Sequence, residues 1–95
     1  MSYVIYIHTC KISGKSYVGI TNKTAEERFA EHCQAARRGS KFAFHGAIRK
    51  YGEDCWVHEA TTTTDSLQKA YEMEMRLIAV AGRVRFRSTK MQLNQ

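Results

Sequence analysis

The sequence predicts one small α+β domain, in which three antiparallel strands and three helices follow one another in the order β-β-α-α-β-α and helices flank the sheet. Three observations lead to this prediction. The chain has only 95 residues, which is the length of a single domain. Its beginning contains two β-branched and aromatic runs, whereas later segments carry apolar residues at helical spacing. Proline is absent, so glycine marks the ends of the elements.

The N-terminal segment is typical of a β-hairpin. Residues 3–8 and 16–20 are rich in β-branched and aromatic side chains, and a polar stretch with Gly14 separates them. Partners in an antiparallel pair have a constant index sum, and any odd sum places Tyr6 and Tyr17 on one face of the sheet. A sum of 23 sets the two tyrosines directly opposite each other, whereas a tight turn gives 27. Two ordinary core tyrosines are the simpler interpretation of this pair.

The first helix is predicted between Thr24 and Arg38. Thr24 and Glu27 have the spacing of a capping box, in which each side chain accepts a hydrogen bond from the other residue's backbone N–H. Gly39 follows where a helix of this length needs a C-terminal stop.

Two further helices and a third strand follow along the chain. An apolar i, i+3, i+4, i+7 pattern predicts a helix over residues 44–51, which ends at Gly52. Residues 55–61 have the composition of a strand. A cap-like start at Asp65 predicts a last helix that reaches about Ala81.

The charge balance favours a polyanionic partner. Fifteen basic and nine acidic residues give a net charge of +6, which points first to nucleic acid and second to a membrane surface. The excess is concentrated after residue 82, where four basic residues and no acidic residue occur: Arg83, Arg85, Arg87 and Lys90. We therefore divide the chain into a domain over residues 1–82 and a weakly patterned basic tail over residues 83–95.

The sequence favours an intracellular location, in the cytoplasm or in a phage-infected cell, over secretion. No apolar run follows a basic start, as a secretory signal requires, and none approaches the roughly 20 residues of a bilayer span. The three cysteines are an odd number, which fits reduced thiols better than a disulfide framework. We expect no association with a membrane.

One carboxylate stands out on the last predicted helix. Glu74 lies inside a stripe of apolar or small residues at helical spacing: Leu67, Ala70, Tyr71 and Ile78. Burial of a lone carboxylate costs several kcal/mol unless it is paired, protonated or bound to a metal. Glu74 is therefore either a boundary residue paired with an arginine or a tyrosine hydroxyl, or a metal ligand.

Arg28 and His32 share one face of the first helix because they are four residues apart. An arginine beside the sheet can hold a phosphate in a bidentate fork, and a histidine can move a proton or donate a hydrogen bond to that phosphate. Glu27 and Glu31 lie close by, so a solvated, salt-bridged helix face is the competing interpretation.

These residues form an ordered set. A Val-Ile-Tyr triplet ends at Tyr6, a Tyr-Val-Gly triplet ends at Gly19, and Arg28, His32 and Glu74 follow. The set resembles the GIY-YIG nuclease domain, whose triplets are Gly-Ile-Tyr and Tyr-Ile-Gly or Tyr-Val-Gly. The Arg-x-x-x-His spacing resembles its homing-endonuclease branch. Gly19 has a structural role in this interpretation: it lies two residues after Tyr17 on the same face, and its missing side chain lets a ligand or a backbone segment come close. The resemblance implies that the fold is the small α+β domain predicted above.

The resemblance implies a divalent-metal-dependent endonuclease that hydrolyses phosphodiester bonds of double-stranded DNA. In that family pattern, Tyr6 is the general base and Tyr17 orients the attacking water or the phosphate. Arg28 clamps the phosphate, and His32 takes the proton onward or contacts the phosphate. Glu74 binds one Mg²⁺ or Mn²⁺ ion.

The resemblance covers about residues 3–80 and leaves sequence specificity open. Asn94 is the nearest counterpart of an asparagine that often ends the family's domain. Specificity would come from an extra DNA-binding segment, a partner protein or a homodimer. We also expect four basic residues to contact the DNA backbone: Lys15, Lys23, Arg37 and Arg38. The alternatives are a non-catalytic nucleic-acid-binding module on the same fold and a basic domain that docks on another protein.

Overall fold

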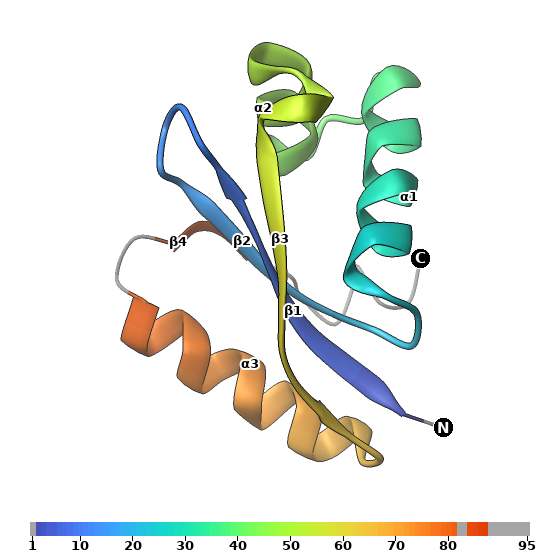
Figure 1. Ribbon diagram of the computed structural model, residues 1–95, viewed down its shortest axis with the longest axis vertical. Helices are drawn as coiled ribbons and strands as arrows, with labels where there is room; N and C mark the ends of the chain where they lie inside the picture. The colour runs from blue at the N-terminus through green and yellow to red at the C-terminus, as the bar shows by residue number, and fades with distance from the viewer. Residues whose placement is uncertain (1, 82–83, 88–95) are drawn as a thin grey trace.

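The computed structural model of the protein describes residues 2–81 and 84–87. The elements follow in the order β1 (Tyr3–Cys10), β2 (Ser16–Thr21), α1 (Ala25–Arg37), α2 (Ala43–Tyr51), a short 3₁₀ turn η1 (Glu53–Cys55), β3 (Trp56–Thr64), α3 (Leu67–Ala81) and β4 (Val84–Arg87). The strand order in the sheet is β3-β1-β2-β4. Helices α1 and α2 lie on one side of this sheet and α3 on the other (Figure 1). The predicted α+β class, the antiparallel trio β2-β1-β3 and the β-β-α-α-β-α order are confirmed.

The fourth strand was not expected. Part of the predicted basic tail, residues 84–87, forms β4 and pairs in parallel with β2. β3 and β4 lie at opposite edges of the sheet and run in the same direction, and α3 is the crossover that connects them. Apolar and basic residues alternate from 84 to 87, which is the signature of a strand. The stretch has only four residues, and two of them are arginines, so it resembles a charged tail more than a strand.

The described helices begin and end where the sequence predicts. The Thr24–Glu27 capping box is present at the start of α1. Gly52 ends α2 with a φ of 90°, a backbone conformation that side chains with a Cβ rarely adopt. The Ser66 hydroxyl accepts a hydrogen bond from the Lys69 backbone N–H at the start of α3.

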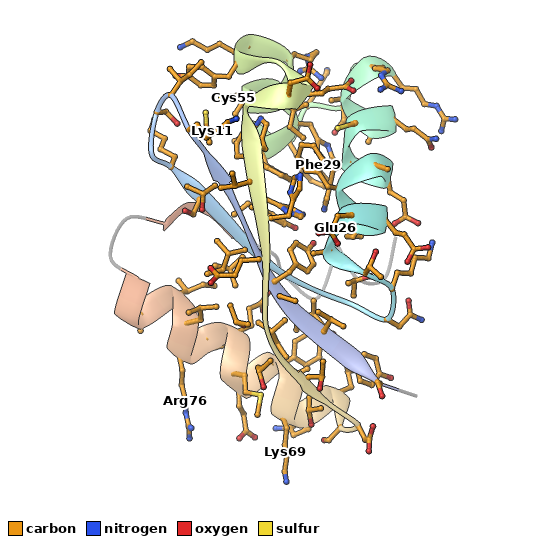
Figure 2. The ribbon with its side chains drawn as sticks, in the orientation of Figure 1. Lys11, Glu26, Phe29, Cys55, Lys69 and Arg76 are labelled. Carbon is orange, nitrogen blue, oxygen red and sulfur yellow. The ribbon has the colours of Figure 1, made fainter. Side chains whose placement is uncertain are left out.

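Two apolar cores lie on the two faces of the sheet. The larger core joins α1, α2 and the first residue of β3 to the sheet, and it is strongly aromatic; its large members are Tyr6, Tyr17, Phe29, Phe44, Ile48 and Trp56. The smaller core packs α3 against the opposite face and contains Ile5, Val18, Ile20 and Ala70. Figure 2 shows Phe29 extending from α1 toward the sheet, whereas Lys69 and Arg76 extend away from α3.

The index sum of the hairpin lies between the two predicted values. Tyr6 pairs with Gly19 and Tyr17 pairs with His8, so the index sum is 25 rather than 23 or 27. An odd sum keeps both tyrosines on the same face, as predicted. The turn that sets this register closes with a 2.9 Å hydrogen bond from the Gly14 N–H to the Cys10 carbonyl.

This register explains the glycine of β2. A Cβ atom on Gly19 would lie 2.5 Å from Tyr6 Cζ and closer still to its hydroxyl oxygen. The Tyr6 side chain is only 1% exposed, so its ring has no open space into which to move. Gly19 thus makes room for the phenol of the opposite strand rather than for a ligand.

Within the residues that the structure describes, no helix combines the length and the apolar character needed to cross a bilayer.

Replacement of Gly19 by alanine should destabilise the fold, because the new methyl group overlaps the buried Tyr6 ring. We expect a loss of about 1–3 kcal/mol in the free energy of unfolding, measured by urea denaturation. Gly46→Ala in α2 is the matched control. Its methyl group meets no atom closer than 3.8 Å, so it should stabilise the helix by about 0.5–1 kcal/mol. A Gly19→Ala variant as stable as wild type would contradict this account.

Candidate functional site

Two tyrosines and a histidine meet between the sheet and the two N-terminal helices. Tyr6 comes from β1, Tyr17 from β2 and His32 from α1. The Tyr6 hydroxyl lies 3.2 Å from His32 Nε2, and the Tyr17 ring meets the His32 ring edge-on with centroids 5.2 Å apart. Tyr17 also stacks on Phe44 of α2 at 4.1 Å. Packing on several sides therefore fixes the orientation of each ring.

Arg28 lies at the edge of this cluster. Its side chain is 23% exposed, and its Nη1 donates a 2.8 Å hydrogen bond to Glu31. The same Glu31 carboxylate is paired with Lys23. The expected salt bridges are thus present, yet Arg28 also interacts electrostatically with the phenols of Tyr6 and Tyr17. One guanidinium therefore links the solvated helix face to the buried tyrosines.

A second histidine, His45 of α2, extends the cluster. Its Nε2 lies 2.8 Å from His32 Nδ1, and its Nδ1 lies 2.6 Å from the Ser40 hydroxyl. His45 was not among the predicted site residues, because only the apolar members of that helix follow the pattern that predicts it. A signal was nevertheless available, because His45 precedes Ile48 by three residues and so lies beside the buried stripe.

Burial keeps the ionisable groups of the cluster neutral. Desolvation is the main cause that lowers the pKa of His32 to about 2, and the neighbouring Arg28 charge adds to it. The pKa of His45 is lowered by burial and by the Arg28 and Arg49 charges. Burial and the nearby Tyr17 raise the pKa of Tyr6 well above 10, although the Arg28 charge opposes this shift. At pH 7 the cluster thus contains neutral rings beside one cation.

A cavity of about 360 Å³ opens beside the cluster. Three of the predicted site residues line it, namely Lys23, Arg28 and His32, together with Glu31 and His45. Its other side is formed by Tyr3 and by residues of α3, including Leu67 and Tyr71. Two cationic side chains at the wall of an open cavity are suited to an anionic ligand such as a phosphate.

Glu74 lies on α3, apart from the cluster in the fold. This helix packs on the sheet face that carries Ile5 and Val18, opposite the face of Tyr6. Glu74 is 4% exposed, so its predicted burial within the apolar stripe is confirmed. Tyr71, one turn earlier on the same helix, lines the cavity. Among the described residues, Glu74 itself is not part of the cavity wall.

Only Lys23 among the predicted DNA-contacting residues adjoins the cavity. Lys15 lies at the other end of β2, roughly 25 Å away at the rise of an extended strand. Arg37 is paired with Glu53 through a 2.7 Å hydrogen bond at the end of α1. Arg38 is exposed beside it.

Asn94, the remaining predicted site residue, lies outside the described residues.

Comparison with known proteins identifies one family. A family model described as the GIY-YIG catalytic domain matches residues 2–87, which include every described helix and strand. No curated protein and no solved structure is significantly similar to the chain.

The buried neutral histidines should make the fold sensitive to mild acid. Burial is the main cause that lowers the pKa of His8 to about 3 and that of His32 to about 2, whereas unfolded histidine has a pKa near 6.5. Their contribution to stability is full above pH 6.5 and is lost as the pH falls toward the folded values. Between pH 7 and 5, a range above most carboxylate titration, we expect a loss of about 1–2 kcal/mol per histidine.

Urea denaturation at pH 7 and pH 5 measures this loss, and His32→Gln should have a shallower pH dependence than wild type. An equal free energy of unfolding at the two pH values would show that these rings are not buried in the neutral form.

Proposed function

The chain belongs to the GIY-YIG catalytic-domain family, a family of nucleases, and on this premise we propose that it is a metal-dependent endonuclease that hydrolyses phosphodiester bonds of double-stranded DNA. The observation that carries this proposal is the contact of the buried Tyr6 with His32 and Arg28, two residues that line a cationic cavity. Tyr6 and Tyr17 are themselves 1% exposed and lie behind the cavity wall. A structural core alone needs neither a guanidinium beside two buried phenols nor an open cavity next to them.

Arg28 is proposed to bind the scissile phosphate. Charge on the phosphoryl oxygens grows as the attacking water approaches, and a fixed guanidinium stabilises that charge. Glu31 holds Arg28 in the free protein, so a phosphate competes with a carboxylate for the same donors. A phosphate that draws Arg28 toward the cavity would uncover the Tyr6 hydroxyl, with which Arg28 interacts.

Tyr6 is proposed to accept a proton from the attacking water. Its hydroxyl is fixed by His32 on one side and influenced by Arg28 on the other. Tyr17 is proposed to orient the water or the phosphate, because it packs beside both His32 and the Tyr6 ring. Such fixed positions reduce the entropy cost of bringing the reactants together.

Glu74 is proposed to hold the metal ion. Among the described residues, no group of three or more histidine, cysteine or acidic side chains could form a complete metal site. A single carboxylate still fits Mg²⁺, which retains several waters and takes its other ligands from substrate phosphates. When bound, the ion would supply Lewis acidity to the phosphoryl group and stabilise the leaving oxygen. Because Glu74 lies on the sheet face opposite Tyr6 and outside the cavity wall, the burial of its carboxylate is what supports this assignment.

Purified full-length protein should nick supercoiled plasmid in Mg²⁺, and EDTA should abolish the nicking. Arg28→Ala should slow cleavage by at least about 100-fold, because it removes the charge opposite the transition state. Tyr6→Phe and Glu74→Gln should also lose activity. Arg76→Ala removes an arginine from the exposed face of α3 and should stay within about threefold of wild type.

Binding of DNA without cleavage would overturn the nuclease proposal in favour of a non-catalytic nucleic-acid-binding module. Absence of both activities would favour a domain that docks on another protein. Metal-dependent cleavage that survives Glu74→Gln would reject the metal assignment alone.

Replacement of Glu31 by glutamine should tighten DNA binding. The Glu31 carboxylate neutralises both Lys23 and Arg28 at the cavity, and its loss frees two cations for phosphates. We expect an increase in affinity of about 3- to 10-fold for a short duplex at low salt, measured by fluorescence anisotropy. Glu26→Gln makes the same charge change on α1 away from the cavity and should have a smaller effect. Equal effects of the two variants would contradict this account.

A further inference from the structure

A continuous row of hydrogen-bonding groups leads from Tyr6 toward the surface. It passes from the Tyr6 hydroxyl to His32 Nε2 (3.2 Å), from His32 Nδ1 to His45 Nε2 (2.8 Å) and from His45 Nδ1 to the Ser40 hydroxyl (2.6 Å). Tyr6, His32 and His45 are buried, whereas Ser40 is partly exposed in the loop between α1 and α2. Each histidine uses both ring nitrogens within the row.

The geometry restricts the protons of the two rings. A neutral imidazole has one N–H donor and one acceptor nitrogen. If His32 carries its proton on Nδ1, it donates to His45, which must then carry its own proton on Nδ1 and donate to Ser40. If His45 donates from Nε2, His32 must carry its proton on Nε2 and donate to Tyr6. Both rings therefore share the same tautomer, and the row has only two consistent directions.

We propose that Tyr6, His32, His45 and Ser40 form a proton relay that carries the proton of the attacking water to solvent. This inference rests on the proposed nuclease function. As a water O–H bond breaks, its proton passes to Tyr6 Oη, and the Tyr6 proton passes to His32 Nε2. The Nδ1 proton of His32 moves to His45 Nε2, the Nδ1 proton of His45 moves to Ser40 Oγ, and the Ser40 hydroxyl proton leaves to solvent.

Every group in the relay ends neutral, and the hydroxide that remains attacks phosphorus as the bond to the leaving oxygen breaks. The reverse shift restores the starting tautomers, with a proton entering at Ser40 and one leaving from Tyr6 Oη. His45 and Ser40 thus act through His32 and Tyr6, as positioning and relay residues that do not touch the phosphate.

The burial of Tyr6 makes such a relay necessary. A phenolate at this position is strongly disfavoured, because burial and Tyr17 raise the pKa of Tyr6 well above 10. A tyrosine that gives up one proton while it accepts another remains neutral throughout. The lowered pKa values of His32 and His45 also keep both rings in the neutral form that a directional row requires.

The row itself is tested without DNA. Long-range ¹H–¹⁵N NMR spectra of the full-length protein at pH 7 report the tautomer of each histidine ring. We expect His32 and His45 to be neutral, to share one tautomer and to have a slowly exchanging ring N–H. Opposite tautomers, or rings that titrate near pH 6.5, would overturn the relay whatever the activity of the protein.

The proton transfer is tested by plasmid cleavage in Mg²⁺. His45→Gln retains a hydrogen bond to His32 but has no second ring nitrogen to pass a proton on, so kcat should fall by about 100-fold with little change in KM. Imidazole should partly restore the activity of His45→Ala, because His45 lines the cavity. His58→Gln is the matched control, since His58 is hydrogen-bonded to His8 and is not part of the row. It should retain activity within about twofold.

Full activity of His45→Gln would overturn the relay while leaving the nuclease proposal intact. Lack of cleavage by wild type would instead reject the nuclease proposal and with it the catalytic relay, and the NMR spectra would then decide only whether the hydrogen-bonded row exists.

Discussion

The close approach of Tyr6 to Gly19 is the contact on which the site depends. The hairpin register sets these two residues opposite each other, and the missing side chain of Gly19 leaves room for the hydroxyl end of the Tyr6 ring. From that position the Tyr6 hydroxyl meets His32 of α1. A shift of the hairpin by one residue would move Tyr6 relative to its glycine and place a side chain where its ring now lies.

The row of Tyr6, His32, His45 and Ser40 is stable because aromatic rings surround it and because its members form hydrogen bonds with one another. Tyr6, Tyr17 and Phe44 pack around His32, so a charged imidazole there would be costly. Neutral rings joined by hydrogen bonds avoid that cost, since every buried donor finds an acceptor along the row. The charged groups next to these rings, Arg28, Glu31 and Lys23, lie instead at the cavity, where they meet solvent.

Much of this arrangement was predictable from the sequence, because strong local signals determine it. The capping box at Thr24, the glycine stops and the periodic helices all appear where local patterns place them. The odd index sum placed both tyrosines on one face, but the turn chemistry did not determine the register. The burial of Glu74 followed from helical spacing alone.

The rest depended on contacts between distant segments. His45 joins His32 only because α1 and α2 pack together, and a pattern search for apolar residues ignores a buried histidine. β4 was concealed because four residues with two arginines resemble a solvated tail until they are seen beside β2. The order of Tyr6 and Glu74 along the chain matched the family pattern, but it contains no information about which sheet face each residue occupies. In the structure, β1 and α3 bring them to opposite faces.

The central claim is that Tyr6 and Arg28 act as one unit on the scissile phosphate. A double-mutant cycle tests it most directly, with plasmid cleavage rates measured for wild type, Tyr6→Phe, Arg28→Ala and the double variant. If the two groups act together, removal of either one abolishes most of their joint contribution to the rate. The second substitution then adds little, and the double variant should be hardly slower than the slower single variant. Rate losses that multiply in the double variant would show that the two residues act independently and would contradict the account.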